Sequence, residues 1–257
     1  MPIFCYNSAM ATIVAIGGGE IGRPGYPVET THIDKRIVEL SGKNHPHLLF
    51  LPTASDDSKG YIDTVQEHFG KRLGCIVQSL NLYDTPSYEA MEDAIRNADI
   101  IYVGGGNTLK MMTKWRKLEV DKLLQQAGER GAVLAGLSAG AICWFSGGLS
   151  DSRSFTSESK SWDYITVRGL GIYNLVLCPH FDVEPQRKEA LKHSLQGSRH
   201  RAIAIDNCVA LEITNDTYRI IGANRERGAY KAYWRGDKYH LESLTSGSAQ
   251  PLSALLT

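Results

Sequence analysis

The stretch "GAVLAGLSAGAICWF", residues 131–145, places a serine between two glycines directly after an apolar run. The run "AVLAGL" (132–137) is typical of a buried strand, and the following "AICWF" has helical character. A serine at a tight turn between strand and helix fits the G-x-S-x-G nucleophile elbow, where small flanking residues let the helix approach the strand. The alternative interpretation is that Ser138 only caps the next helix.

Similar apolar segments recur before this stretch, and they alternate with segments of helical periodicity. Strands that are apolar throughout and separated by amphipathic helices predict a parallel sheet covered on both faces. After residue 150 we expect a strand at "NLVLC", a helix from about Pro185 to Leu195, and closing strands or hairpins. The earlier strand-like segments are "TIVAI" (12–16), "LLFLP" (48–52), "CIVQSLNL" (75–82) and "DIIYVGG" (99–105).

These patterns predict an α/β fold built on a mostly parallel sheet that helices cover on both faces. We find no repeat and no linker, so residues 10–257 are expected to form a single domain. Met10, before "ATIVAIGGG", is a plausible second start, which makes residues 1–9 an extension outside the fold.

The composition favours a small molecule or another protein as partner. The 257 residues carry 28 acidic and 28 basic side chains, so charge gives no reason to expect nucleic acid or an anionic membrane. Apolar runs fall short of the ~20 residues that span a bilayer, and the N-terminus lacks a signal-peptide pattern, so we expect a cytoplasmic protein. No disulfide framework, zinc site or other metal site is expected, because the five cysteines are scattered: Cys5, Cys75, Cys143, Cys178 and Cys208.

A serine nucleophile needs a general base. Of eight histidines, His180 alone follows a strand-like run, "LVLCP", and the carboxyl edge of a parallel sheet is also where the elbow emerges. The other histidines lie in polar or helix-surface contexts. The alternative is that His180 is a structural histidine beside Pro179.

The acid that would orient the base is less clearly marked. Glu212, in "CVALEI", is a carboxylate within an apolar strand, where burial without a partner is costly, and an imidazole would relieve that cost. Asp151, soon after the elbow helix, is the alternative acid, whereas Asp182 and Glu184 lie too near His180 in the chain to reach its Nδ1 easily. Glu212 could also simply face solvent on an alternating strand.

A second glycine cluster, "GGGNT" (104–108), follows the strand "DIIYV" and opens a helix. Backbone N–H groups at such a turn can receive a developing oxyanion. We therefore expect the N–H of Ala139 and that of Gly105 or Gly106 to form an oxyanion hole, with Asn107 as a substrate-binding candidate. Otherwise the segment is a flexible turn with an Asn/Thr cap.

The segment "GGGEIG" (17–22) satisfies the G-x-G-x-x-G dinucleotide fingerprint after a strand, and Glu39 lies near the position of a ribose-binding acid. This pattern supports a rival hypothesis, an oxidoreductase using a nicotinamide or flavin. Pro24 and Pro27 argue against it, because they forbid the long helix that should begin within the fingerprint.

Taken in order, "VGGGNT", "GLSAGAICW" and "CPHF" resemble peptidase family S51, the group that contains peptidase E and cyanophycinase. The resemblance implies a doubly wound α/β sandwich related to class I glutamine amidotransferases. It also implies Ser138 as nucleophile, His180 as base and "GGGNT" at the oxyanion site. "VALEI" matches the family's glutamate strand loosely, which favours Glu212 with Asp151 as its alternative.

In peptidase E an arginine after the histidine motif helps to recognise an acidic side chain, so the resemblance makes Arg187 either that arginine or a surface residue. The expected activity is hydrolysis of dipeptides or short peptides, including Asp-X, without a cofactor. Hydrolysis of another amide or ester, or a binding protein that keeps the elbow, stays open. A homodimer also stays open.

Overall fold

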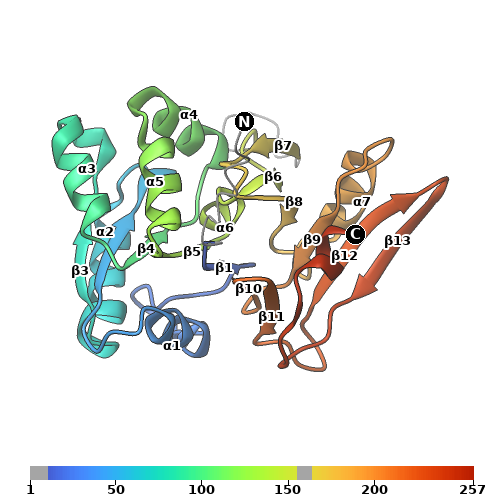
Figure 1. Cartoon of the computed structure of the whole chain (residues 1–257), viewed down its shortest axis with the longest axis horizontal. Helices are drawn as coiled ribbons and strands as arrows, with labels where there is room; N and C mark the ends of the chain where they lie inside the picture. Colours follow the sequence, from blue (N-terminus) through green and yellow to red (C-terminus); the bar gives the residue numbers. More distant parts are fainter. Residues whose placement is uncertain (1–10, 155–163) are drawn as a thin grey trace, which may run out of the picture.

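The computed structural model describes residues 11–154 and 164–257, which form two β-sheets with flanking helices (Figure 1). The proposed extension at residues 1–9 lies outside the described residues. The larger sheet has eight strands in the order β14-β11-β10-β1-β5-β4-β2-β3. Five of them run parallel: β1 (Ile13–Ile16), β2 (His47–Leu51), β3 (Ile76–Ser79), β4 (Ile100–Val103) and β5 (Val133–Leu137).

Antiparallel strands extend this sheet beyond β1 and build much of the second sheet. The second sheet has the order β13-β12-β9-β8-β6-β7, in which β6, β8 and β9 are parallel. The remaining strands are β6 (Phe145–Ser150), β7 (Ile165–Arg168), β8 (Tyr173–Cys178), β9 (Ala202–Ile205), β10 (Ala210–Thr214), β11 (Thr217–Ile221), β12 (Ala229–Arg235), β13 (Lys238–Ser243) and β14 (Gln250–Pro251).

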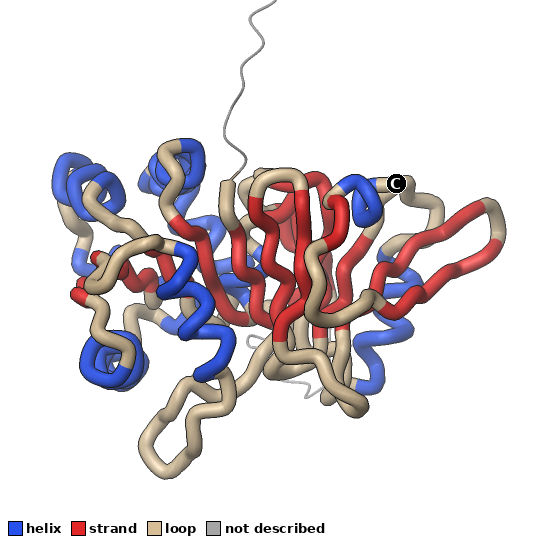
Figure 2. The backbone as a smooth tube through the Cα atoms, turned by 60° about the horizontal axis from the view of Figure 1, so that its bottom comes forward, coloured by secondary structure: helices blue, strands red, loops and turns tan. Residues whose placement is uncertain are grey.

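Helices lie on either side of the strands (Figure 2). The α-helices are α1 (Thr31–Leu40), α2 (Lys59–Val65), α3 (Tyr88–Arg96), α4 (Thr108–Leu118), α5 (Val120–Glu129), α6 (Ala139–Ile142), α7 (Pro185–Ser194) and α8 (Ser253–Leu256). Shorter 3₁₀ segments are η1 (Thr53–Ser55) and η3 (Leu82–Asp84), and a π-helix, η2 (Gln66–Arg72), continues α2.

Four of the five parallel strands of the first sheet, β1, β2, β4 and β5, are buried on both faces, whereas β3 lies at the sheet edge and is partly exposed. Successive side chains of a strand point to opposite sides of the sheet. In β1, Val14 packs into the cluster that contains Ile33 of α1 and Val65 of α2. Its neighbour Ile13 packs instead into the cluster that contains α4 and α5. This two-sided burial explains why the sequence shows continuous apolar runs and not alternation.

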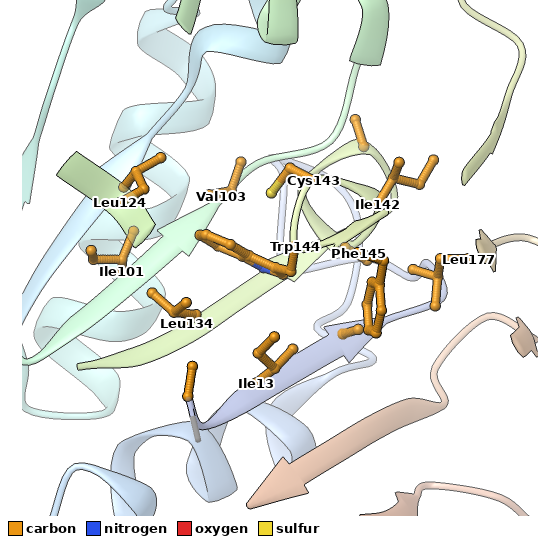
Figure 3. Close-up of a cluster of buried hydrophobic side chains, with 14 of the residues drawn as sticks. Ile13, Ile101, Val103, Leu124, Leu134, Ile142, Cys143, Trp144, Phe145 and Leu177 are labelled. Atoms are coloured by element: carbon orange, nitrogen blue, oxygen red, sulfur yellow. The ribbon is translucent and has the colours of Figure 1, made fainter. Parts of the chain in front are cut away.

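The short helix α6 lies between the two sheets, because it contacts β1, β4 and β5 of the first sheet and β6 and β8 of the second. Figure 3 shows the buried side chains around it, among them Ile142, Cys143 and Trp144. Trp144 and Phe145, which follow α6, are fully buried in one cluster with Ile13 of the first sheet and Leu177 of the second. The residues after the elbow therefore join the two sheets into one core.

The α/β fold, the sheet flanked by helices and the positions of the predicted strands are confirmed. Two details differ. The helix expected at "AICWF" has only four residues, because β6 begins at Phe145. The closing strands divide between the sheets: β10 and β11 extend the first, whereas β9 and β12 belong to the second.

A partly buried ion pair connects α1 to β10. Arg36 Nε and Nη2 donate to the two carboxylate oxygens of Glu212 at 2.8 and 3.0 Å. Glu212 is 4% exposed, and its hydrogen bond with Arg36 raises the pKa of the guanidinium. The other side of the guanidinium meets the exposed Glu39 at 3.3 Å.

Replacement of Glu212 by alanine should lower the free energy of unfolding by about 1–3 kcal/mol, because it removes a charge-assisted bidentate pair and leaves Arg36 unpaired on that side. Urea unfolding of the wild-type and variant proteins measures the change. Glu39→Ala is the matched control and should cost less than ~0.5 kcal/mol, since that carboxylate is exposed. An equal change in the free energy of unfolding for the two variants would show that the pair with Glu212 stabilises the fold no more than the exposed pair with Glu39 does.

Candidate active site

The turn from β5 to α6 has the geometry of a nucleophile elbow. Ser138 stands at this turn with φ 57° and ψ −109°, a backbone conformation that L-residues rarely adopt. Gly140 permits the turn, because a Cβ there would lie 2.0 Å from the carbonyl oxygen of Val103. The serine is therefore held in a strained position by close packing of helix against strand.

The hydroxyl of Ser138 faces an imidazole. Its Oγ lies 2.8 Å from Nε2 of His180, although the two residues are 42 positions apart in the chain. Ser138 occupies the position before the first residue of α6, but its side chain makes no capping bond within the described residues. The expectation that these residues meet at the strand ends agrees with this geometry, and the capping alternative does not.

The third member of the hydrogen-bonded group is Asn207. Its side-chain Oδ1 lies 2.8 Å from Nδ1 of His180, and its backbone N–H donates to Oδ1 of Asp182 at 2.9 Å. An amide oxygen can only accept, so Nδ1 carries the proton and Nε2 is left to accept from the Ser138 hydroxyl.

Glu212 does not fill this place, and the prediction that it contacts the imidazole is wrong. Its carboxylate belongs to the ion pair with Arg36 described above. The need of this buried charge for a partner was inferred correctly, but the partner is a guanidinium. Asp151, the alternative acid, follows β6 and does not bond to His180 Nδ1, which Asn207 already holds.

A sequence signal for Asn207 did exist. β8 and β9 are parallel neighbours, and His180 and Asn207 each stand two residues after the end of their strand. Residues at such equivalent places meet at one edge of the sheet. The search for an acidic residue passed over this neutral one.

The segment "GGGEIG" (17–22) packs against His180 and Asn207. A Cβ at Gly18 would lie 2.1 Å from Oδ1 of Asn207 and 2.5 Å from the His180 ring, so only glycine allows the approach. Beyond it the chain forms a loop with an isolated bridge between Ile21 and Val28, and α1 begins only at residue 31. The missing helix, foreseen from the two prolines, removes the structural basis of the dinucleotide hypothesis.

The second glycine cluster lies beside the elbow. A Cβ at Gly105 would lie 3.5 Å from Cβ of Ser138, and the Gly105 N–H donates to the Tyr61 hydroxyl at 3.2 Å. Gly106, with φ 138°, follows it. Ala139 is the first residue of α6, so its N–H has no acceptor within the helix. Because Gly105 has a partner, Gly106 and Ala139 are the better candidates for an oxyanion site.

Asn107 has a structural role, and its expected role in substrate binding is not supported. Its Oδ1 accepts the N–H of Lys110 at 2.9 Å and so caps α4, while its Nδ2 donates to the carbonyl of Ser152 at 3.1 Å. Both ends of the amide are therefore occupied, as in the alternative interpretation of "GGGNT" as a turn with a cap.

Arg187 is neither a surface residue nor a free guanidinium. It is 1% exposed, bonds to the carboxylate of Glu184 at 2.7 Å, donates to the carbonyl of Leu149 at 3.1 Å, and lies 4.9 Å over the Tyr164 ring. The expectation that Arg187 receives an acidic substrate side chain is not supported, because its charge is already satisfied within the protein.

Burial lowers the pKa of His180 below its ordinary value of 6.5. The hydrogen bond with Asn207 opposes this shift, Arg187 reinforces it, and the carboxylates of Glu184 and Asp151 oppose it. The lowered pKa favours the neutral imidazole at neutral pH, which is the form that could accept a proton.

A cavity of about 540 Å³ opens beside Leu137, the residue before Ser138. The loop after β1 forms one wall and the start of α2 forms the other. The lining residues that concern the site are Gly19, Glu20, Ile21, Arg23, Tyr26 and Tyr61.

In residues 11–154 and 164–257 no three His, Cys, Asp or Glu side chains gather in a way that could hold a metal ion. The same ranges contain no helix of the length and apolar character needed to cross a membrane.

Comparison with known proteins identifies the family. Residues 11–221 match the model of peptidase family S51. The chain is 35% identical over 228 residues to the uncharacterized peptidase YgaJ of Bacillus subtilis (strain 168), covering 87% of this chain and 91% of that protein. It is 27% identical over 205 residues to peptidase E of Shewanella denitrificans, covering 76% and 82%.

Solved structures of peptidases share the fold. A peptidase from an acI-B1 Actinobacterium superposes with a TM-score of 0.71 at 20% identity, covering 95% of this chain and 98% of that one. A putative peptidase E from Listeria monocytogenes EGD-e superposes with a TM-score of 0.62 at 19% identity, covering 84% and 100%. The family match over most of the chain, the named relatives and this shared fold lead to one conclusion: the chain belongs to peptidase family S51 and is an enzyme, a peptidase.

Proposed function

We propose that this enzyme is a serine peptidase that hydrolyses dipeptides or other short peptides through Ser138, His180 and Asn207. The observation that carries the proposal is the hydrogen-bonded chain at the elbow, in which both bonds of the imidazole measure 2.8 Å. The names of the relatives, peptidase and peptidase E, support the choice of a peptide bond as the target.

In the proposed mechanism Ser138 Oγ attacks the scissile carbonyl carbon while His180 Nε2 takes the hydroxyl proton. The carbonyl oxygen becomes an oxyanion that receives hydrogen bonds from the N–H groups of Ala139 and Gly106. His180 then gives its proton to the leaving amine, and water releases the acyl group by the reverse sequence. Asn207 keeps the imidazole in the tautomer that these steps require.

Hydrolysis of another amide or of an ester on the same site is the second candidate, because the relay and the proposed oxyanion donors suit any acyl transfer. A panel containing dipeptides, aminoacyl amides and simple esters separates the two. For each substrate, kcat/KM is divided by the rate constant of its uncatalysed hydrolysis. If the enzyme is a peptidase, we expect this ratio to be larger for at least one peptide than for every ester.

Ser138→Ala should lower kcat/KM by at least ~10³-fold, since loss of a triad serine removes the covalent route. Peptide hydrolysis by equal concentrations of folded wild type and variant measures the loss. A fluorophosphonate reagent should label the wild type on Ser138, as located by mass spectrometry, and should not label the variant.

Ser41→Ala is the matched control, because that hydroxyl bonds to backbone groups at the end of α1: it donates to the Val38 carbonyl and accepts the N–H of Lys43. It should retain wild-type activity. Labelling at a serine other than 138, with full activity in Ser138→Ala, would refute the proposed nucleophile.

The pH dependence follows from the lowered pKa of His180. Only the neutral imidazole accepts a proton. Activity should therefore be lost as the pH falls through this pKa, and it should reach its full value at pH values above it. The acid limb of kcat/KM against pH should therefore have its midpoint below 6.5, the ordinary value for histidine. A midpoint above that value would contradict the assignment of a buried, neutral base.

Substitutions of Asn207 test the third position. Asn207→Leu keeps the size but removes the acceptor, and should lower kcat by ~10²-fold or more with little change in KM. Asn207→Asp should move the acid limb of the profile upward by about 1 unit or more, because a carboxylate beside the imidazole favours the protonated form. Full activity in Asn207→Leu, with unchanged thermal unfolding, would exclude an orienting role.

A further inference from the structure

The cavity beside the nucleophile is placed to receive part of the substrate. Leu137 lines it and directly precedes Ser138. Tyr61 lines it as well, and its hydroxyl accepts the N–H of Gly105 next to the elbow. Gly19, on the opposite wall, follows the glycine that packs against the ring of His180. The lining residues are thus chain neighbours of Ser138 and Gly18 and a hydrogen-bond partner of Gly105, which places the cavity next to the proposed catalytic group.

We propose that this cavity binds an uncharged aliphatic or aromatic side chain of the substrate residue next to the scissile bond, and that Glu20 makes it unsuitable for an acidic one. This inference rests on the proposed function, since it names the substrate class of the same site.

The walls of the cavity supply apolar surface. Ile21, Leu137 and Pro24 line it with apolar groups, and the rings of Tyr61 and Tyr26 complete the lining. Phe50 stacks edge-on against Tyr61 with ring centroids 5.1 Å apart, which fixes that wall. Its volume of about 540 Å³ falls within the range of pockets that enclose small molecules. Burial of an aliphatic or aromatic side chain here is favourable because it removes apolar surface from water.

The two charged residues of the lining neutralise each other. Glu20 Oε2 accepts from Arg23 Nε at 2.6 Å, and Glu20 Oε1 accepts the N–H groups of Gly22 and Arg23 at 3.1 and 2.9 Å. Burial opposes ionisation of Glu20, but the hydrogen bonds from Arg23 and the backbone hold its pKa below the ordinary value. The guanidinium also lies 4.9 Å over the Tyr26 ring.

This arrangement disfavours a substrate carboxylate. Arg23 is the cation that lines the cavity, and Glu20 already holds it in a charge-assisted hydrogen bond. An incoming aspartate side chain would have to compete with Glu20 for Arg23 and would meet its negative charge. An uncharged side chain has neither cost.

Binding to the inactive Ser138→Ala enzyme tests the inference without catalysis. Isothermal titration with Phe-Leu and Asp-Leu compares two dipeptides that differ only in the side chain assigned to the cavity. We expect Phe-Leu to bind at least ~10-fold more tightly. Equal affinity, tighter binding of Asp-Leu, or no binding of either dipeptide would overturn the inference.

Glu20→Gln in the same background tests the charge argument. Release of Arg23 should strengthen Asp-Leu binding by ~10-fold and leave Phe-Leu within about twofold. Glu67→Gln is the matched control, because Glu67 is also ion-paired, to Lys71, but lies on the exposed side of η2. If Glu20→Gln weakened both dipeptides alike, Glu20 would only hold the loop, and its proposed role in specificity would be wrong.

Hydrolysis by the wild type then separates this inference from the proposed function. Selective binding of Phe-Leu without its hydrolysis would leave the cavity assignment intact and refute the peptidase mechanism. Hydrolysis that favours Asp-Leu over Phe-Leu would support the mechanism and refute the cavity assignment.

Discussion

The site depends on three successive backbone carbonyls where β1 ends. The carbonyl of Ile16 accepts the N–H of Ser138, that of Gly17 accepts the N–H of His180, and that of Gly18 accepts the N–H of Cys208, at 3.0, 3.0 and 2.9 Å. Ser138 follows a strand of the first sheet, whereas the other two segments follow strands of the second. One short piece of main chain therefore holds Ser138 and His180 directly, and holds Asn207 through its chain neighbour Cys208.

The same connection explains how the strain at the site is tolerated. Ser138, His180 and Cys208 all have positive φ, at 57°, 55° and 61°, which costs of order 1–3 kcal/mol for each such residue. Each of them donates its N–H to the end of β1, so the surrounding hydrogen bonds hold the backbone in place. The glycines at 17–19 let this main chain come close to the segments that carry His180 and Asn207. A side chain at Gly18 would collide with both residues.

Sequence reasoning located Ser138 and His180 because their place in the chain carries a simple topological meaning. Both come directly after apolar strands, and ends of parallel strands share an edge. It failed on Glu212 because a buried carboxylate in a strand demands a partner without revealing which one, and Arg36 lies 176 residues away in the chain. It failed on Arg187 because an arginine on a predicted helix gives no sign that it will be 1% exposed.

Asn207 was missed for a chemical reason, and that reason bears on how the proposed mechanism works. A carboxylate beside His180 would stabilise the imidazolium by its charge and raise the pKa of the ring. A neutral amide offers orientation alone, in a place where burial and the nearby Arg187 already disfavour the charged ring. Activation of Ser138 would then rest on a correctly placed neutral base more than on charge compensation, and the fixed geometry at the end of β1 is what supplies that placement.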